Sequence, residues 1–216
     1  MLLSGGVDSA VTLYMAKQDY EIEALIFDYG QRAQKEIECA KKVAEAAEVP
    51  FKILKISLPW KGSALLDIGE EIPEGELSEG GEIPGTYVPG RNIIFLSFAV
   101  SFAEAIGARA VFIGAHQLDF SNYPDCREEF FKSFQKTIKR GTKRGSEGRE
   151  IRIVTPVIDK TKKEIVEEGN ILGVPFEYTW SCYKEGEAPC GVCESCLFRE
   201  KAFDEAGAPD PVEKTI

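Results

Sequence analysis

The chain has 216 residues, of which 44% are hydrophobic, so it can bury the continuous core of one domain of ordinary size. Its formal net charge of −10 argues against broad electrostatic attachment to nucleic acid or to an anionic membrane. The first residues, MLLSGG, contain no basic region followed by an apolar run, and no stretch approaches the roughly 18 apolar residues of a membrane span. We therefore expect a cytoplasmic protein that acts on small molecules and binds neither nucleic acid nor membranes directly.

Strands and helices are predicted to alternate along the chain, because short apolar runs are followed by segments with apolar residues at helical spacing. The predicted strands cover residues 2–3, 22–29, 51–57, 108–115 and 151–157. The predicted helices cover residues 8–16, 34–48, 92–107, 127–139 and 162–172. This alternation predicts the α/β class, with a Rossmann-like, doubly wound parallel sheet.

Two connections and the tail complete the predicted organisation. Residues 59–90 are rich in Gly, Pro and Glu and are too long for an ordinary connection, so we expect a mobile cover over a site. Residues 140–149 are basic and rich in glycine, which predicts a flexible loop. We expect residues 1–180 to form the main domain and residues 181–216 to form a zinc-binding subdomain packed on it.

A glycine-containing string follows the first predicted strand and opens the first helix, where an open α/β sheet binds its ligands. Its glycines let the backbone approach an anion, its serines add hydroxyl donors, and the helix terminus offers free N–H groups. A plain glycine turn with a capped helix is the alternative, but the complete string favours a phosphate site. The residues concerned are Ser4, Gly5, Gly6, Val7, Asp8 and Ser9.

Four of the six cysteines lie close together near the end of the chain, at Cys182, Cys190, Cys193 and Cys196. Four thiolates complete a tetrahedral zinc shell and leave no open position, so we expect one structural zinc ion per chain. An iron–sulfur cluster or unliganded thiols are the alternatives. Cys39 lies on the apolar stripe of a predicted helix and is expected to be a small buried hydrophobe.

The string from Ser4 to Ser9 resembles the signature of the ATP-pyrophosphatase, or PP-loop, family. Members of this family cleave ATP between the α and β phosphates and transfer AMP to an oxygen of the substrate. The resemblance implies that all six residues of the string hold the pyrophosphate part of ATP, together with Mg²⁺. The sequence contains neither a Walker loop nor a kinase loop, which agrees with adenylation.

Further strings resemble the 7-cyano-7-deazaguanine synthase family and cover nearly the whole chain. They are YGQR at 29–32, Pro89 with Arg91-Asn92, DFSNYPDCR at 119–127, TK-EIV at 161–166, and the cysteine tail with 198–199 and 202–203. The chain departs from the family pattern at Ala33, where His is frequent, and at His116, where Asn is frequent. His116 is expected to be a polar residue at the lip of the crevice.

The resemblance implies a C–N bond-forming ligase that converts 7-carboxy-7-deazaguanine and ammonium to 7-cyano-7-deazaguanine, a precursor of queuosine and archaeosine, at the expense of two ATP. Arg91, Lys162 and Arg127 are expected to neutralise phosphate charge, and Asp125 to accept N–H groups of the guanine-like edge. Cys126 is expected in the substrate crevice, where a cationic neighbour favours its thiolate. A homodimer is the expected assembly.

Two other functions remain open from the sequence. A PP-loop enzyme that thiolates tRNA would use Cys126 as its sulfur carrier, but the acidic balance and the lack of an added RNA-binding domain argue against it. A DNA-binding or nucleotide-sensing regulator would use the cysteine tail as a zinc ribbon, but this tail carries more Glu than Lys.

Overall fold

The computed structural model of the chain describes residues 1–60, 62–67, 69–75, 83–116 and 123–212. Its strands are β1 (Ala24–Asp28), β2 (Phe51–Lys55), β3 (Ala110–Phe112) and β4 (Arg152–Val154). Its α-helices are α1 (Val7–Lys17), α2 (Lys35–Ala46), α3 (Arg91–Ile106), α4 (Glu128–Gly141), α5 (Lys143–Ser146), α6 (Lys162–Leu172) and α7 (Glu194–Glu205). Short 3₁₀ turns, η1 and η2, lie at Pro124–Cys126 and Phe176–Tyr178. The predicted α/β class is confirmed, and the observed strands are shorter than the predicted ones.

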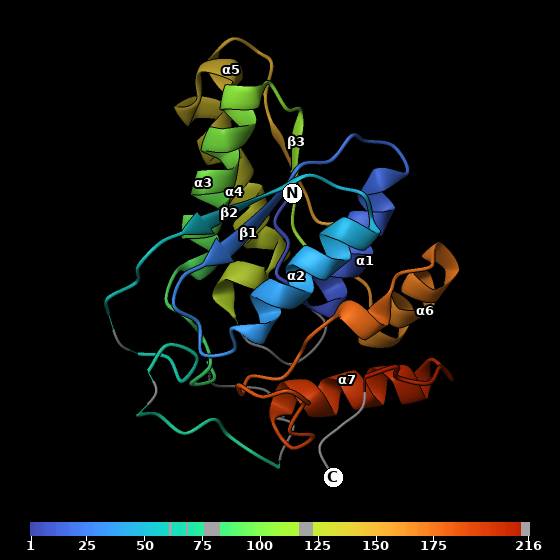
Figure 1. Cartoon of the computed structure of the whole chain (residues 1–216). Coiled ribbons are helices and arrows are strands. Elements are labelled where there is room, and N and C mark those ends of the chain that lie inside the picture. Colours follow the sequence, from blue (N-terminus) through green and yellow to red (C-terminus); the bar gives the residue numbers. More distant parts are fainter. Residues whose placement is uncertain (61, 68, 76–82, 117–122, 213–216) are drawn as a thin grey trace.

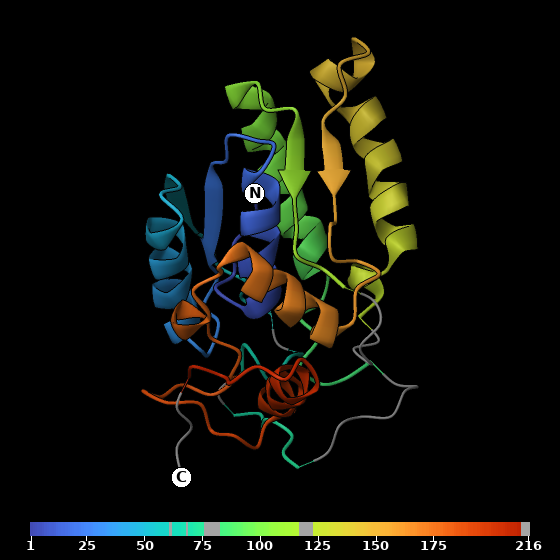
Figure 2. The same ribbon diagram turned by 90° about the vertical axis from the view of Figure 1, so that its right-hand side faces the viewer.

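The N-terminal segment joins two parallel strand pairs into one sheet. β1 pairs with β2 and β3 pairs with β4, all in parallel. Leu2 forms a parallel bridge with Leu25, and its N–H donates to the carbonyl of Phe112 at 2.9 Å. The side-by-side order is therefore β2, β1, the N-terminal segment, β3 and β4, with helices on both sides (Figure 2). This is the doubly wound arrangement predicted from the sequence.

Two hydrophobic cores lie on opposite faces of this sheet, because neighbouring side chains of a strand point to opposite sides. Ala24 and Ile26 of β1 pack with α1, α2 and α6, whereas Leu25 and Phe27 pack with α3 and α4. Figure 1 shows these two groups of helices on either side of the strands. Since β1 is buried on both faces, its sequence reads as an unbroken apolar run.

Helix α6 begins and ends where the sequence predicted. Thr161 Oγ1 accepts the backbone N–H of Glu164 at 3.2 Å, and Glu164 Oε2 accepts the N–H of Thr161 at 2.7 Å. This reciprocal capping box satisfies two free donors at the start of the helix, and Gly173 ends the helix in the left-handed conformation. The cap fixes the first turn of α6, which carries Lys162.

The expectation of a flexible loop at residues 140–149 is wrong, because this segment contains the short helix α5. Thr142 Oγ1 caps that helix by accepting the N–H of Gly145 at 3.0 Å. Arg144 donates a guanidinium hydrogen bond to the carbonyl of Ala108 at 2.7 Å and its backbone N–H to Glu104 at 2.8 Å. These contacts attach the segment to the end of α3.

The described parts of residues 59–90 pack against the cysteine tail. Ala64 and Ile72 are buried in one cluster with the tail cysteines, and Glu74 forms an antiparallel bridge with Cys193. Residues 61, 68 and 76–82 of the expected cover lie outside the described residues. The segment therefore contributes to the wall around the tail.

Helix α7 crosses below the carboxyl ends of the strands (Figure 1), and two features join the tail to the main domain. The backbone N–H of Trp180 donates to the carbonyl of Gly5 at 2.9 Å. The buried guanidinium of Arg199 makes a bidentate ion pair with Asp210 and also donates to Thr179. Among the described residues, no helix combines the length and apolar character that a bilayer crossing requires.

Candidate functional site

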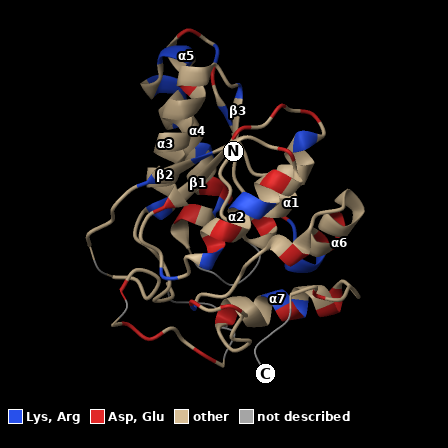
Figure 3. Cartoon of the chain, in the orientation of Figure 1, with Lys and Arg blue, Asp and Glu red and all other residues tan. Residues whose placement is uncertain are grey.

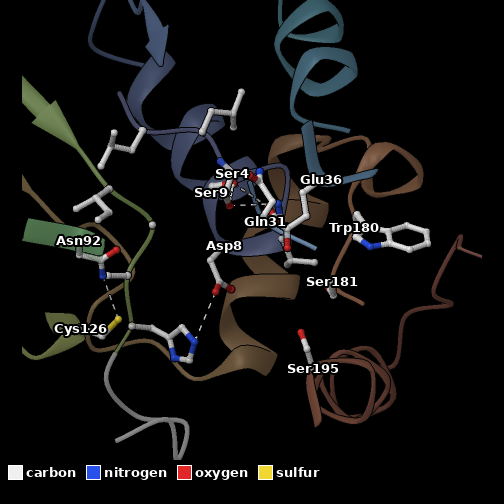
Figure 4. A pocket seen from close by; sticks show the side chains of 18 of the residues that line it. Ser4, Asp8, Ser9, Gln31, Glu36, Asn92, Cys126, Trp180, Ser181 and Ser195 are labelled. Atoms are coloured by element: carbon white, nitrogen blue, oxygen red, sulfur yellow. Dashed lines mark hydrogen bonds and ion pairs between the residues drawn. The ribbon is translucent and has the colours of Figure 1, made fainter. Parts of the chain in front are cut away.

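A pocket of about 300 Å³ opens at the carboxyl end of the sheet, where an open α/β fold binds its ligands. Its walls come from the glycine loop, the segments that follow β1 and β3, the first turns of α2, α3 and α6, and the tail (Figure 4). The predicted site residues among its lining are Ser4, Gly6, Val7, Asp8, Ser9, Arg91, Cys126 and Lys162. Segments more than 150 residues apart thus meet at one site.

The glycine loop is held in shape by its own serines. Ser4 Oγ donates to Ser9 Oγ at 3.0 Å, and Ser9 Oγ donates to the carbonyl of Gly6 at 3.0 Å. Gly5 does not line the pocket but lies behind the loop, with φ at +87°. A Cβ atom at this position would come within 2.3 Å of the carbonyl oxygen of Glu36 in α2. The loop can therefore approach α2 only because position 5 has no side chain.

Replacing Gly5 with alanine is expected to lower the free energy of unfolding by about 3 kcal/mol, since backbone strain adds to the clash with α2. Urea denaturation measures this loss. Gly30→Ala is the matched control, because Gly30 also has a positive φ, of +81°, but a Cβ there meets nothing within 4 Å. The control should lose only about 1 kcal/mol from strain. Equal losses in the two variants would contradict the close approach of loop and helix.

Asp8 lies at the start of α1 with its carboxylate between two nitrogen groups. Lys162 Nζ is 2.6 Å from Asp8 Oδ2, and His116 Nε2 is 3.5 Å from the same oxygen. Burial acts to raise the pKa of Asp8, but the charges of Lys162 and His116 outweigh burial and hold that pKa below its ordinary value. Asp8 Oδ1 is buried and accepts no hydrogen bond from the described residues. Asp8 is therefore ionised at neutral pH and has one oxygen available to a ligand.

His116 lies beside Asp8 in the wall of the pocket, with 10% of its side chain exposed. Burial and the charge of Lys162 lower the pKa of His116 to about 4, although Asp8 acts in the opposite direction. The imidazole is therefore neutral near pH 7. His116 is a polar wall residue, close to the position expected from the sequence.

The predicted residues Asp125 and Cys126 lie in η1, against the start of α3. Asp125 Oδ2 accepts the backbone N–H of Asn92 at 3.1 Å, and Asn92 Nδ2 donates to the carbonyl of Asp125 at 3.0 Å. Asp125 is 5% exposed and is not among the residues that line the pocket, whereas Cys126 is. Residues 119–122 of the same motif lie outside the described residues. This geometry positions the first turn of α3, which carries Arg91.

The expectation that a cationic neighbour favours the Cys126 thiolate is wrong. Burial and the carboxylate of Asp125 raise the pKa of Cys126 to about 11, and the opposing charge of Arg91 is the weaker effect. Asn92 Nδ2 lies 3.4 Å from the sulfur. Cys126 is therefore a neutral thiol at physiological pH.

Arg91 and Arg127, both predicted to neutralise phosphate charge, lie in different surroundings. Arg91 lines the pocket and donates to the hydroxyl of Tyr29 at 3.4 Å. Arg127 is exposed at the N-terminus of α4 and does not line the pocket. Gln31 of the same YGQR string is buried and bonds to the backbone of Tyr29 and Phe27, so it shapes the end of β1.

Several pocket residues were not expected from the sequence. Glu36 enters the pocket from the first turn of α2, and Ser181 and Ser195 enter it from the tail (Figure 4). The two serines are each adjacent to a predicted metal ligand, at Cys182 and Cys196. This adjacency could have predicted both serines, because residues next to the metal ligands line the pocket if the cysteine cluster lies against it.

The four tail cysteines converge as predicted. Their sulfur atoms all lie within 4.8 Å of one another, and two of the pairs are separated by 3.9 and 4.0 Å. Zinc–sulfur bonds of about 2.3 Å in a tetrahedron place the sulfurs about 3.8 Å apart. A multi-iron cluster would hold some of the sulfurs farther apart, because its thiolates bind to different iron ions. Backbone N–H groups of Lys184 and Cys190 also point to the sulfur of Cys182, so the group fits a single metal ion.

Comparisons with known proteins identify the family of the chain. The family described as "Queuosine biosynthesis protein QueC" matches residues 1–207. A 7-cyano-7-deazaguanine synthase of Trichodesmium erythraeum is 48% identical over 98% of this chain and 98% of its own. A protein of the same name from Leptospira interrogans is 50% identical over 97% of this chain and 88% of its own. The NMN synthetase of Francisella tularensis aligns with 96% of this chain and 76% of its own, but at 18% identity and a TM-score of 0.47. The chain belongs to the QueC family of queuosine biosynthesis proteins.

Proposed function

We propose that the protein is an ATP-dependent ligase that converts 7-carboxy-7-deazaguanine and ammonium to 7-cyano-7-deazaguanine. The observation that carries this proposal is the near full-length identity of 48–50% to proteins named 7-cyano-7-deazaguanine synthase. The pocket supports it, because a glycine loop, a helix N-terminus and the cations Lys162 and Arg91 surround one cavity. Such a cavity suits a nucleotide bound beside a second small molecule.

The glycine loop is proposed to hold the pyrophosphate part of ATP. Free N–H groups at the start of α1 supply donors, the hydrogen bonds of Ser4 and Ser9 hold the loop in shape, and Lys162 supplies positive charge. The unpaired Oδ1 of Asp8 fits a bound Mg²⁺, since hard cations prefer carboxylate oxygen. Magnesium would neutralise charge on the departing pyrophosphate.

Adenylation solves a leaving-group problem twice. A carboxylate resists attack by ammonia because oxide is a very poor leaving group, whereas AMP leaves readily from an acyl-adenylate. The amide formed first must then lose its oxygen to become a nitrile, and a second AMP activates that oxygen. Arg91 is proposed to stabilise negative charge that develops at the reacting centre. Asp125 is proposed to act by positioning Arg91 through Asn92, and Arg127 to attract anionic substrates from the surface.

The tail is proposed to form a zinc-binding subdomain at residues 181–216, with one structural ion held by the four cysteines. The ion would fix the turns that carry Ser181 and Ser195 into the pocket. We also propose a cytoplasmic homodimer, because the apolar side chains of Ile93, Phe98 and Ile106 on α3 are exposed.

Two features of the structure argue against the thiolation of tRNA as the function. Cys126 is a neutral thiol, and sulfur transfer needs a thiolate. Lys and Arg residues gather around α5, at the far end of the molecule from α7 and the tail (Figure 3). A bound RNA would need that charge beside the pocket.

A product assay tests the proposed function. Purified protein given ATP, ammonium and 7-carboxy-7-deazaguanine is expected to release AMP and pyrophosphate and to form the nitrile, with an amide intermediate when ATP is limiting. Mass spectrometry identifies the products. Release of ADP and orthophosphate alone, or accumulation of thiolated tRNA in a parallel reaction without nitrile, would overturn the proposal.

A further inference from the structure

The pocket contains a carboxyl group that none of these roles uses. Glu36 lies in the first turn of α2, and its side chain lines the pocket between the glycine loop and the tail (Figure 4). Among the residues that the structure describes, its carboxyl group makes no hydrogen bond and no ion pair, and the charge that acts on it is that of Arg91. Both oxygens are therefore available to a ligand.

Glu36 and Asp8 occupy the same pocket but have opposite surroundings. Asp8 is paired with Lys162, and its pKa is lowered. Burial raises the pKa of Glu36 to about 7, and the charge of Arg91 opposes this only in part. Two carboxyl groups whose pKa values are driven apart in one site commonly divide between them the electrostatic and the proton-transfer roles.

The groups that face Glu36 come from several elements. Arg91 reaches it from α3 and Tyr29 from the segment after β1, and both interact with it electrostatically. Ser181 lies near it on the tail side (Figure 4). Glu194 and Arg199 also line the pocket from α7. Arg91 is the cation whose charge lowers the pKa of Glu36, so part of the Glu36 population is ionised at neutral pH.

The proposed reaction needs a group of this kind. Ammonium carries a positive charge and has no lone pair, so it must be held by an anion and must lose a proton before it can attack carbon. A base works best when its pKa is close to the working pH. Protein carboxylates with ordinary pKa values are weak bases for this purpose, and a buried one is stronger.

We propose that Glu36 binds the ammonium ion and accepts its proton, which deepens the proposed function and rests on it. One N–H bond of ammonium breaks and an O–H bond forms on Glu36. The lone pair of the resulting ammonia attacks the acyl carbon, a C–N bond forms, and the C–O bond to AMP breaks. AMP leaves with the bonding electrons, and the surplus proton of the new amide nitrogen passes to its phosphate.

Three other titratable groups of the pocket are less suited to this step. The carboxylate of Asp8 is paired with Lys162 and its pKa is lowered, so it is a weak base. His116, with a pKa of about 4, is a weak base, and Cys126, with a pKa of about 11, holds its own proton. Glu36 lines the same pocket, makes no ion pair with the described residues, and has a pKa of about 7.

The test separates adenylation from attack by nitrogen in the variant Glu36→Gln. Without ammonium, wild type and variant given ATP and 7-carboxy-7-deazaguanine should show pyrophosphate bursts whose rates agree within about threefold. With ammonium, the variant should form amide and nitrile about 100-fold more slowly, the usual cost of losing a catalytic base. Hydroxylamine, which is largely neutral at pH 7.5 and needs no deprotonation, should give hydroxamate at similar rates with both proteins.

The matched control is Glu38→Gln, because Glu38 lies in the same turn of α2 but is exposed and pairs with Lys35. It should keep the wild-type rate. Glu36→Asp retains a carboxylate and should recover part of the activity. For wild type, kcat/KM for ammonium should rise with pH through about 7, as Glu36 ionises, and Glu36→Gln should lack this inflection.

Three results would overturn the assignment: a wild-type nitrile rate in Glu36→Gln, an equal loss of the pyrophosphate burst, or an equal loss with hydroxylamine. The second would place Glu36 in the binding of ATP or the acid instead. If wild-type protein itself gives no pyrophosphate burst with the deazaguanine acid, the proposed function fails, independently of Glu36.

Discussion

Replacing Cys193 with serine is expected to abolish metal binding and to lower the free energy of unfolding by at least about 4 kcal/mol, or roughly 10 °C in Tm. Cys193 is fully buried, its sulfur lies 3.9 Å from that of Cys182, and it is the N-cap residue of α7. Losing one of four thiolates opens the shell and leaves three uncompensated ligands in an apolar cluster. Metal analysis by mass spectrometry and thermal unfolding measure the two effects.

Cys39→Ala is the matched control, because Cys39 is buried in the same apolar cluster but is not one of the four converging sulfurs. It should keep about one zinc per chain and lose only about 1 kcal/mol. If Cys193→Ser retains zinc, or if wild-type protein that folds correctly contains none, the structural zinc site is wrong.

Cys193→Ser should also weaken catalysis, because the metal ligands alternate with pocket residues along the tail. Ser181 and Ser195 are separated from the cluster by a single peptide bond each, and the N–H of Trp180 binds the glycine loop at Gly5. Movement of the tail therefore changes the pocket directly. A partial loss of zinc and a loss of ATP cleavage should run in parallel across a titration with chelator.

Local patterns predicted the parts of the fold whose causes are local. Helix α6 was predicted at its observed bounds, because Thr161 and Glu164 form its cap and Gly173 ends it within a few residues of sequence. The sequence also predicted that the glycine loop opens α1 and that the four tail cysteines converge, because both depend on short-range spacing. The short strands were overestimated, since pairing in the sheet decides where each strand ends.

The remaining features depend on burial, which a sequence does not display. Cys126 has a charged neighbour on each side in sequence, yet burial decides its pKa. Arg144 lies in a basic, glycine-rich string, yet it bonds to Ala108 and orders its segment. Glu36 looks like one of many helical glutamates, and only the folded structure brings it beside Arg91 in the pocket. The surroundings of these residues therefore depend on tertiary contacts, which the sequence alone does not predict.

Replacing Lys162 with methionine is expected to lower the rate of AMP formation by about 10²–10³-fold, the usual cost of removing one positive group from a phosphate-transfer site. Lys162 Nζ lies 2.6 Å from Asp8 Oδ2, so the variant also leaves a buried carboxylate without its main partner. The control is Lys163→Met, because Lys163 is exposed and pairs with Glu167 at 3.6 Å on the surface. That variant should change stability by no more than about 0.5 kcal/mol and leave AMP formation unchanged.

The pH dependence of stability gives an independent test of the same ion pair. Because the folded-state pKa of Asp8 is lowered, the pair stabilises wild type above the pKa of the unfolded carboxyl, and this contribution is lost as pH falls through the folded pKa. Lys162→Met should therefore be less stable than wild type by about 1–3 kcal/mol at pH 7, discounted from a fully buried pair because both side chains are about one-fifth exposed. The difference should shrink as pH falls below about 4.

Adding Asp8→Asn to Lys162→Met removes the unpaired charge and should restore part of the lost stability, as a double-mutant cycle measures. Additive losses from the two substitutions would contradict the pairing of Asp8 with Lys162.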